Sequence, residues 1–104
     1  MAQAIYKIFH FRYTADWYNL SVDEKHAIEA KIEESRKAAG CEVLLMDACV
    51  SDEKWLGWGV EKYPSLEAVT QHTIGMFNIQ WFKYIEAESS LGVELPQNLN
   101  PELI

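Results

Sequence analysis

The stretch Trp58-Gly59-Val60-Glu61-Lys62-Tyr63-Pro64-Ser65-Leu66-Glu67-Ala68 joins a strand to a helix. Trp58 to Glu61 continue a run of strand-forming residues that begins at Trp55, and Tyr63-Pro64-Ser65 closes this strand. Ser65 is a favourable N-cap residue, and Glu67 complements the positive end of the helix dipole. The stretch therefore predicts a strand over residues 55–61 and a helix that begins at Ser65.

Similar signals on both sides of this junction predict the remaining elements. Ser21-Val22-Asp23-Glu24 is a capping box that starts a helix, and Gly40 is a residue that commonly ends one. The other predicted strands are Ala4–Tyr13, Cys41–Val50 and Lys83–Ser90. The predicted connections are an aromatic segment over 14–20, a polar turn over 51–54, and a turn or short helix over 78–82.

The predicted order is strand, helix, strand, strand, helix, strand, which describes an α+β ferredoxin-like βαββαβ domain over residues 1–92. Its sheet has an apolar face that must be covered, and in a chain of 104 residues we expect the cover to be a second copy. Residues 93–104 predict an extended C-terminal arm because Pro96 and Pro101 interrupt them.

The composition narrows the range of partners. The formal net charge of −7 disfavours binding to nucleic acid, which is itself anionic. No segment reaches the roughly 18 apolar residues that a membrane span needs, and no signal peptide is apparent, so we expect a cytoplasmic protein. Cys41 and Cys49 lie too far apart in one predicted strand for a disulfide, so we expect free thiols.

The passage from Trp58 to Ala68, together with the later Tyr84-Ile85-Glu86-Ala87, resembles the dimeric α+β barrel superfamily, also called ferredoxin-like barrels. Leu20–Lys25 and Trp81–Tyr84 are also similar to small uncharacterised bacterial families of this fold, the darcynin-like proteins among them. The resemblance covers about residues 4–92. It implies a four-stranded antiparallel sheet with both helices on one face, and either a second subunit on the other face or a ligand cavity between sheet and helices.

The superfamily includes monooxygenases, isomerases, cyclases, lyases, heme-binding proteins and members without known activity, so the resemblance specifies fold more than function. One branch uses a His-Pro-x-His motif after the second helix, whereas His72 is followed here by Thr73 and Ile74. A single imidazole remains available as a general base. Heme binding through His72 is an alternative.

Three residues are candidate catalytic groups. Helical periodicity places His72 on the flank of the buried stripe of its helix, where it would face a cavity. The predicted members of that stripe are Leu66, Val69, Thr73, Met76 and Phe77. His10 and Tyr6 share one face of the first strand, with His10 as a second candidate base and Tyr6 as a hydrogen-bond donor. A buried histidine with only a structural hydrogen bond is the alternative interpretation of either imidazole.

Four further residues are candidate substrate contacts. Trp55 and Trp58 would form pocket walls, and Tyr84 would donate a hydrogen bond. Gly57 and Gly59 are expected to share a face with Trp55 and to leave a hollow beside its ring, unless a helix or a partner's side chain fills it. Asp47 interrupts an apolar strand and would need a partner such as Arg12 or Lys7 if buried.

These residues predict a homodimer that binds a small apolar or aromatic organic molecule in each subunit. The predicted chemistry is that of a cofactor-free monooxygenase, isomerase or cyclase. No metal or cofactor is expected, because the sequence has no metal-ligand motif and no glycine-rich phosphate loop. The alternative is a structural or regulatory dimer without catalytic activity.

Overall fold

The structure is a computed structural model that describes residues 3–95 and residue 102. Its elements are β1 (Ile5–Tyr13), α1 (Ala15–Tyr18), α2 (Val22–Ala39), β2 (Glu42–Ala48), β3 (Gly57–Tyr63), α3 (Leu66–Ile79), α4 (Trp81–Tyr84) and β4 (Ile85–Gly92). The predicted order of strands and long helices is confirmed, and two four-residue helices are added to it. Most of the predicted C-terminal arm lies outside the described residues.

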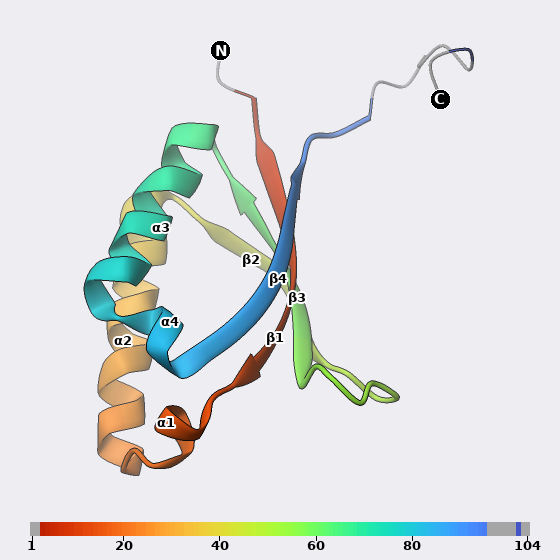
Figure 1. Cartoon of the computed structure of the whole chain (residues 1–104). Coiled ribbons are helices and arrows are strands. Elements are labelled where there is room, and N and C mark those ends of the chain that lie inside the picture. Colours follow the sequence, from red (N-terminus) through yellow and green to blue (C-terminus); the bar gives the residue numbers. More distant parts are fainter. Residues whose placement is uncertain (1–2, 96–101, 103–104) are drawn as a thin grey trace.

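The four strands form one antiparallel sheet in the order β2-β3-β1-β4. The helices lie on one side of this twisted sheet, and the other side carries no helix (Figure 1). The predicted α+β ferredoxin-like fold is therefore confirmed. Within the described part of the chain, no helix is long and apolar enough to cross a bilayer.

Local signals start and end the two long helices. The Ser21 side chain accepts from the Glu24 backbone N–H, and the Glu24 carboxylate accepts from the Ser21 backbone N–H, so the predicted capping box is present. Gly40 ends α2 with φ of 72°, in the left-handed region that glycine adopts without strain. Ser65 caps α3 by accepting from the Ala68 N–H at 3.1 Å.

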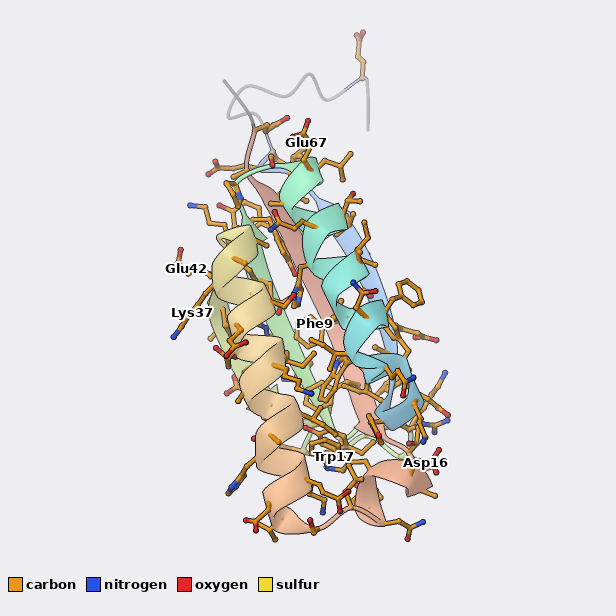
Figure 2. All side chains as sticks on the ribbon, turned by 90° about the vertical axis from the view of Figure 1, so that its left-hand side faces the viewer. Phe9, Asp16, Trp17, Lys37, Glu42 and Glu67 are labelled. Atoms are coloured by element: carbon orange, nitrogen blue, oxygen red, sulfur yellow. The ribbon has the colours of Figure 1, made fainter. Side chains whose placement is uncertain are left out.

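The core consists of two buried clusters between the sheet and the helices. One contains Trp17, Ile32, Met76, Trp81 and Ile85. The other contains Ala39, Tyr63, Ala68 and Val69. Figure 2 looks onto the helices, with Phe9 between α2 and α3 and Trp17 at the end of the sandwich where α1 lies. The aromatic connection over 14–20 therefore packs against the core through Trp17.

Alternate residues of the central strand β1 face opposite sides of the sheet. Phe9 and Phe11 face the helices, and their neighbours Ile8 and His10 face the side without helices, which we call the open face. Strand register places Leu45, Asp47, Trp58, Val60 and Glu88 on the same open face. The Ile8 side chain is 50 % exposed and that of Leu45 is 49 % exposed, so this face presents apolar surface to solvent.

The predicted hollow at the glycines of β3 is not present. A Cβ atom on Gly57 would lie 2.7 Å from the ring of Phe11, and one on Gly59 would lie 2.6 Å from the ring of Phe9. The two phenyl rings of β1 therefore occupy the space that the glycines leave. Trp55 lies on the opposite face, where its ring is 6.4 Å from that of His10.

Candidate functional site

A cavity of about 360 Å³ lies between the sheet and the helices α2 and α3. Its apolar lining includes Phe9, Phe11, Ile32, Met76, Trp81 and Ile85. The exposed residues Phe82, Ala87 and Ser89 also line it, so one mouth lies between the end of the helical layer and the edge strand β4. The exposed residues Glu29 and Glu33 of α2 and Met46 of β2 line its other side. The volume and the apolar lining are typical of a site for a small organic molecule.

His72 is the histidine of this cavity, and its side chain is almost completely buried, with 1 % exposed. Its Nδ1 lies 2.8 Å from the hydroxyl oxygen of Ser35 on α2. Burial lowers the pKa of His72 to about 4, because the low-dielectric interior disfavours the imidazolium. The imidazole is therefore neutral at pH 7.

A buried ionic cluster forms the polar end of the cavity. Glu61 on β3 is 2 % exposed and accepts from the Tyr63 hydroxyl at 2.9 Å and from the Arg36 Nε at 2.9 Å. Arg36 also donates to Glu33 through Nη1 at 2.6 Å. Both oxygens of the buried Glu61 carboxylate are thus satisfied, which offsets the cost of burying its charge.

The charge of Glu61 in this cluster also raises the pKa values of Cys41 and Tyr63. Burial and the negative charge of Glu61 raise the pKa of Cys41 to about 11, and the same two causes raise the pKa of Tyr63. The Cys41 thiol is therefore protonated at neutral pH and a poor nucleophile. Both cysteines are free, as predicted.

Lys7 brings a second positive charge to the cavity wall. It lies directly across from Glu61 in the β1–β3 register, and its ammonium nitrogen lies 5.8 Å from the centre of the Phe9 ring. None of the ion pairs between described residues includes it. Lys7 and His72 both line the cavity.

The seven predicted site residues do not form one cluster. His72 lines the cavity. Tyr6, His10, Asp47 and Trp58 lie on the open face by strand alternation and register, and Trp55 joins them through its ring contact with His10.

Two of these residues have surroundings that the sequence did not indicate. Tyr84 packs against Trp17, with ring centres 6.1 Å apart, at the edge of the first core cluster. Asp47 is exposed, and its proposed partner Arg12 pairs instead with Glu86 at 2.6 Å.

The sequence did not predict the ionic cluster or the contact of Ser35 with His72. One signal could have identified Glu61, because it alternates with Gly57, Gly59 and Tyr63 on the helix-facing side of β3. A carboxylate on a buried strand face needs a charged partner. Arg36 and Ser35 carry no such local signal, because their contacts depend on how α2 crosses α3 and β3.

Comparison with solved structures places this architecture among known folds. A protein named as a candidate chlorite dismutase superimposes with a TM-score of 0.72 at 16 % identity, over 91 % of this chain and 45 % of its own. The present chain thus spans less than half the length of that protein. A DABB-family protein with a ferredoxin-like fold from Mesorhizobium loti gives a TM-score of 0.54 at 12 % identity, over 89 % and 98 % of the two chains.

A candidate monooxygenase from Shewanella loihica gives a TM-score of 0.50 at 12 % identity, over 93 % of this chain and 99 % of its own. The chain has a ferredoxin-like fold. No protein-family model matches its sequence, and no curated protein sequence is similar to it. The resemblance is therefore confirmed at the level of fold.

Proposed function

We propose that this protein binds a small apolar or aromatic organic molecule in the cavity between the sheet and α2–α3. The observation that carries the proposal is the 360 Å³ apolar cavity in which His72, Lys7 and Glu61 converge. A few polar groups in an apolar lining orient a ligand, whereas the lining supplies most of the binding free energy. His72 would contact the ligand because its ring forms part of the cavity wall.

The reaction class that we propose is cofactor-independent oxygenation, isomerisation or cyclisation of the bound molecule. The fold shared with a candidate monooxygenase supports this class. A buried histidine with a strongly shifted pKa in a cavity is also typical of a functional site.

We further propose that two copies associate through their open faces. Ile8 and Leu45 each leave about half of their side chains in water in the single chain, beside Trp58 and Val60. Burial of such apolar surface favours association. Trp55 and Trp58, which were predicted as substrate contacts, and Tyr6, which was predicted as a catalytic hydrogen-bond donor, would then serve the interface.

The test of the binding proposal blocks the cavity at its mouth. Ala87 is exposed and lines the cavity, so Ala87→Phe places a ring in it without disturbing the buried core. Ala30→Phe makes the same change on the exposed surface of α2, away from the cavity. We expect a panel of aromatic quinols, measured by ligand-observed NMR, to bind the wild type and Ala30→Phe and to lose binding to Ala87→Phe.

Equal binding by both variants would contradict the proposal. In that case the non-catalytic alternative, a structural or regulatory dimer, would account better for the aromatic residues on the open face. Loss of binding in Ala30→Phe as well would point to misfolding, which circular dichroism of each variant detects.

A further inference from the structure

We propose that the ligand of the cavity carries an anionic oxygen, and that His72 and Lys7 each donate a hydrogen bond to it. This inference rests on the proposed function, and it gives His72 a role as a donor in place of the general base that the sequence predicts. It identifies the ligand class as an aromatic or apolar carboxylate, phenolate or enolate.

The hydrogen bond with Ser35 determines the tautomer of His72. The Ser35 hydroxyl lies 2.8 Å from Nδ1. Hydroxyls within helices commonly donate to the carbonyl four residues earlier, as Thr70 and Thr73 do on α3. Among the described residues, the side-chain hydrogen bonds of Ser35 include only the one with His72, so the hydroxyl hydrogen is available to Nδ1.

A neutral imidazole carries one proton, so an Nδ1 that accepts from Ser35 leaves the proton on Nε2. Ser35 holds Nδ1 on the α2 side of the ring, which leaves Nε2 for the cavity that His72 lines. The cavity is thus presented with an N–H donor. Ser35 is a positioning residue, because it acts on the ligand only through His72.

Lys7 differs from the other cation of the cavity because it has no ion-pair partner among the described residues. Of the two cations that line the cavity, Arg36 already binds both Glu61 and Glu33. Lys7 takes no part in the ion pairs between described residues, although it lies across from Glu61 in the sheet. Two of the three carboxylates that line the cavity are bound to Arg36, and the third, Glu29, is exposed. An ammonium group beside such an apolar cavity favours an anionic ligand over a neutral one.

The carboxylates that line the cavity are consistent with this assignment. Glu61 accepts from Tyr63 and Arg36 through its two oxygens, so each oxygen already has a donor within the protein. Glu33 accepts from Arg36 and is more than half exposed, and Glu29 is also exposed. Solvent screens the charges of these last two groups.

The binding test compares naphthoate with methylnaphthalene, which has a similar shape but no charge, by isothermal titration calorimetry at pH 7. We expect naphthoate to bind about tenfold more tightly, because a hydrogen bond to a charged group contributes more than a neutral one. Lys7→Met should remove the preference, whereas Lys31→Met, the same change on the exposed surface of α2, should retain it. Naphthol measured between pH 7 and pH 10 distinguishes a phenolate from a carboxylate as the favoured group.

His72 is tested with two substitutions. Gln carries an N–H donor close to the position of Nε2, and Phe carries none. We expect His72→Gln to keep most of the preference for naphthoate and His72→Phe to weaken it. The opposite order, or a preference unchanged by both substitutions, would overturn the assignment of His72 as a donor.

Nitrogen-15 NMR of the imidazole gives a readout that needs no ligand. We expect the wild type to have the Nε2–H tautomer and Ser35→Ala to give a mixture of tautomers with the fold intact. An Nδ1–H tautomer in the wild type would overturn the inference. If methylnaphthalene binds as tightly as naphthoate, the anion assignment fails while the proposed function stands; if neither probe nor the quinol panel binds, the proposed function itself fails.

Discussion

His72 occupies an environment that disfavours its own charge. The side chain is 1 % exposed and hydrogen-bonded to Ser35. The negative charges of Glu61 and Glu33 favour the imidazolium, and the positive charges of Arg36 and Lys7 disfavour it, but burial is the largest influence on its pKa. The free energy of unfolding therefore depends on pH through the protonation of His72.

The pKa of His72 predicts the direction of that pH dependence. The folded pKa is about 4 and the ordinary value is 6.5, so between these values the unfolded chain binds more protons. The contribution of His72 to stability is complete above pH 6.5 and is lost as pH falls towards 4, by about 3 kcal/mol in all. Urea unfolding at pH 7 and pH 4.5 should show a larger loss for the wild type than for His72→Gln.

The wild type and His72→Gln contain the same carboxylates. The difference between their losses of stability therefore removes the contribution of carboxylate protonation and leaves that of His72. Equal losses of the free energy of unfolding would mean that His72 is protonated as readily in the folded chain as in the unfolded one.

The position of His72 shows that the sequence did not predict which side of α3 is buried. Helical periodicity gave a stripe that included Leu66 and Phe77, and placed His72 on its flank. In the structure Leu66 is 58 % exposed and Phe77 is 64 % exposed, and the buried set is Ala68, Val69, His72 and Met76. The stripe is rotated because α3 packs beside α2, and a sequence pattern does not define that packing.

At the scale of elements, the register of β2 shows a similar limit. Strict alternation places Val43, Leu45 and Asp47 on one face. The pairing of β2 with β3 shifts between Val43 and Leu45, so that Val43 falls opposite Glu61 whereas Leu45 falls opposite Val60. One extra residue in a strand reverses the direction of every side chain after it. The helices themselves could be predicted, because the capping box, Gly40 and Ser65 start or end a helix through contacts with residues close in the sequence.

The close approach of α2 and α3 depends on Gly75 of α3. A Cβ atom on Gly75 would overlap the hydroxyl oxygen of Ser35, the group that holds His72. The glycine thus permits the helix spacing at which the Ser35–His72 hydrogen bond forms.

We expect Gly75→Ala to destabilise the fold by about 1–3 kcal/mol, because overpacking outweighs the gain in helix propensity. In a Ser35→Ala background the cost should be smaller, since the overlapping oxygen is absent. A double-mutant cycle by urea denaturation measures this coupling. Additive effects of the two substitutions would show that the helices separate freely at this point.

For the whole molecule, the two faces of the sheet have different roles in our proposal. The face towards the helices contains the cavity, and the open face presents Ile8, Leu45 and Trp58 to solvent. Sequence alone could predict that a small α+β sheet leaves a face uncovered. It could not assign the candidate residues to the correct face, because that depends on the bulge in β2 and on the course of the chain at Trp55.

The dimer proposal predicts different effects from two matched substitutions. Ile8→Glu introduces a charge at the centre of the open face, and we expect it to give a particle of 12.0 kDa in multi-angle light scattering. Ile74→Glu makes the same change on α3, where the side chain is 55 % exposed, and should leave the dimer intact. A wild-type protein that is already monomeric at working concentration would contradict the proposal.

The aromatic cluster at the end of the sandwich has an optical consequence. The indoles of Trp17 and Trp81 lie 5.7 Å apart at an interplanar angle of 87°, and Trp81 also lines the cavity. Two chromophores this close share their electronic transitions, and the shared signal depends steeply on their mutual orientation. The protein therefore contains an intrinsic exciton-coupled pair at its proposed site, through which near-ultraviolet circular dichroism could follow occupancy without a label.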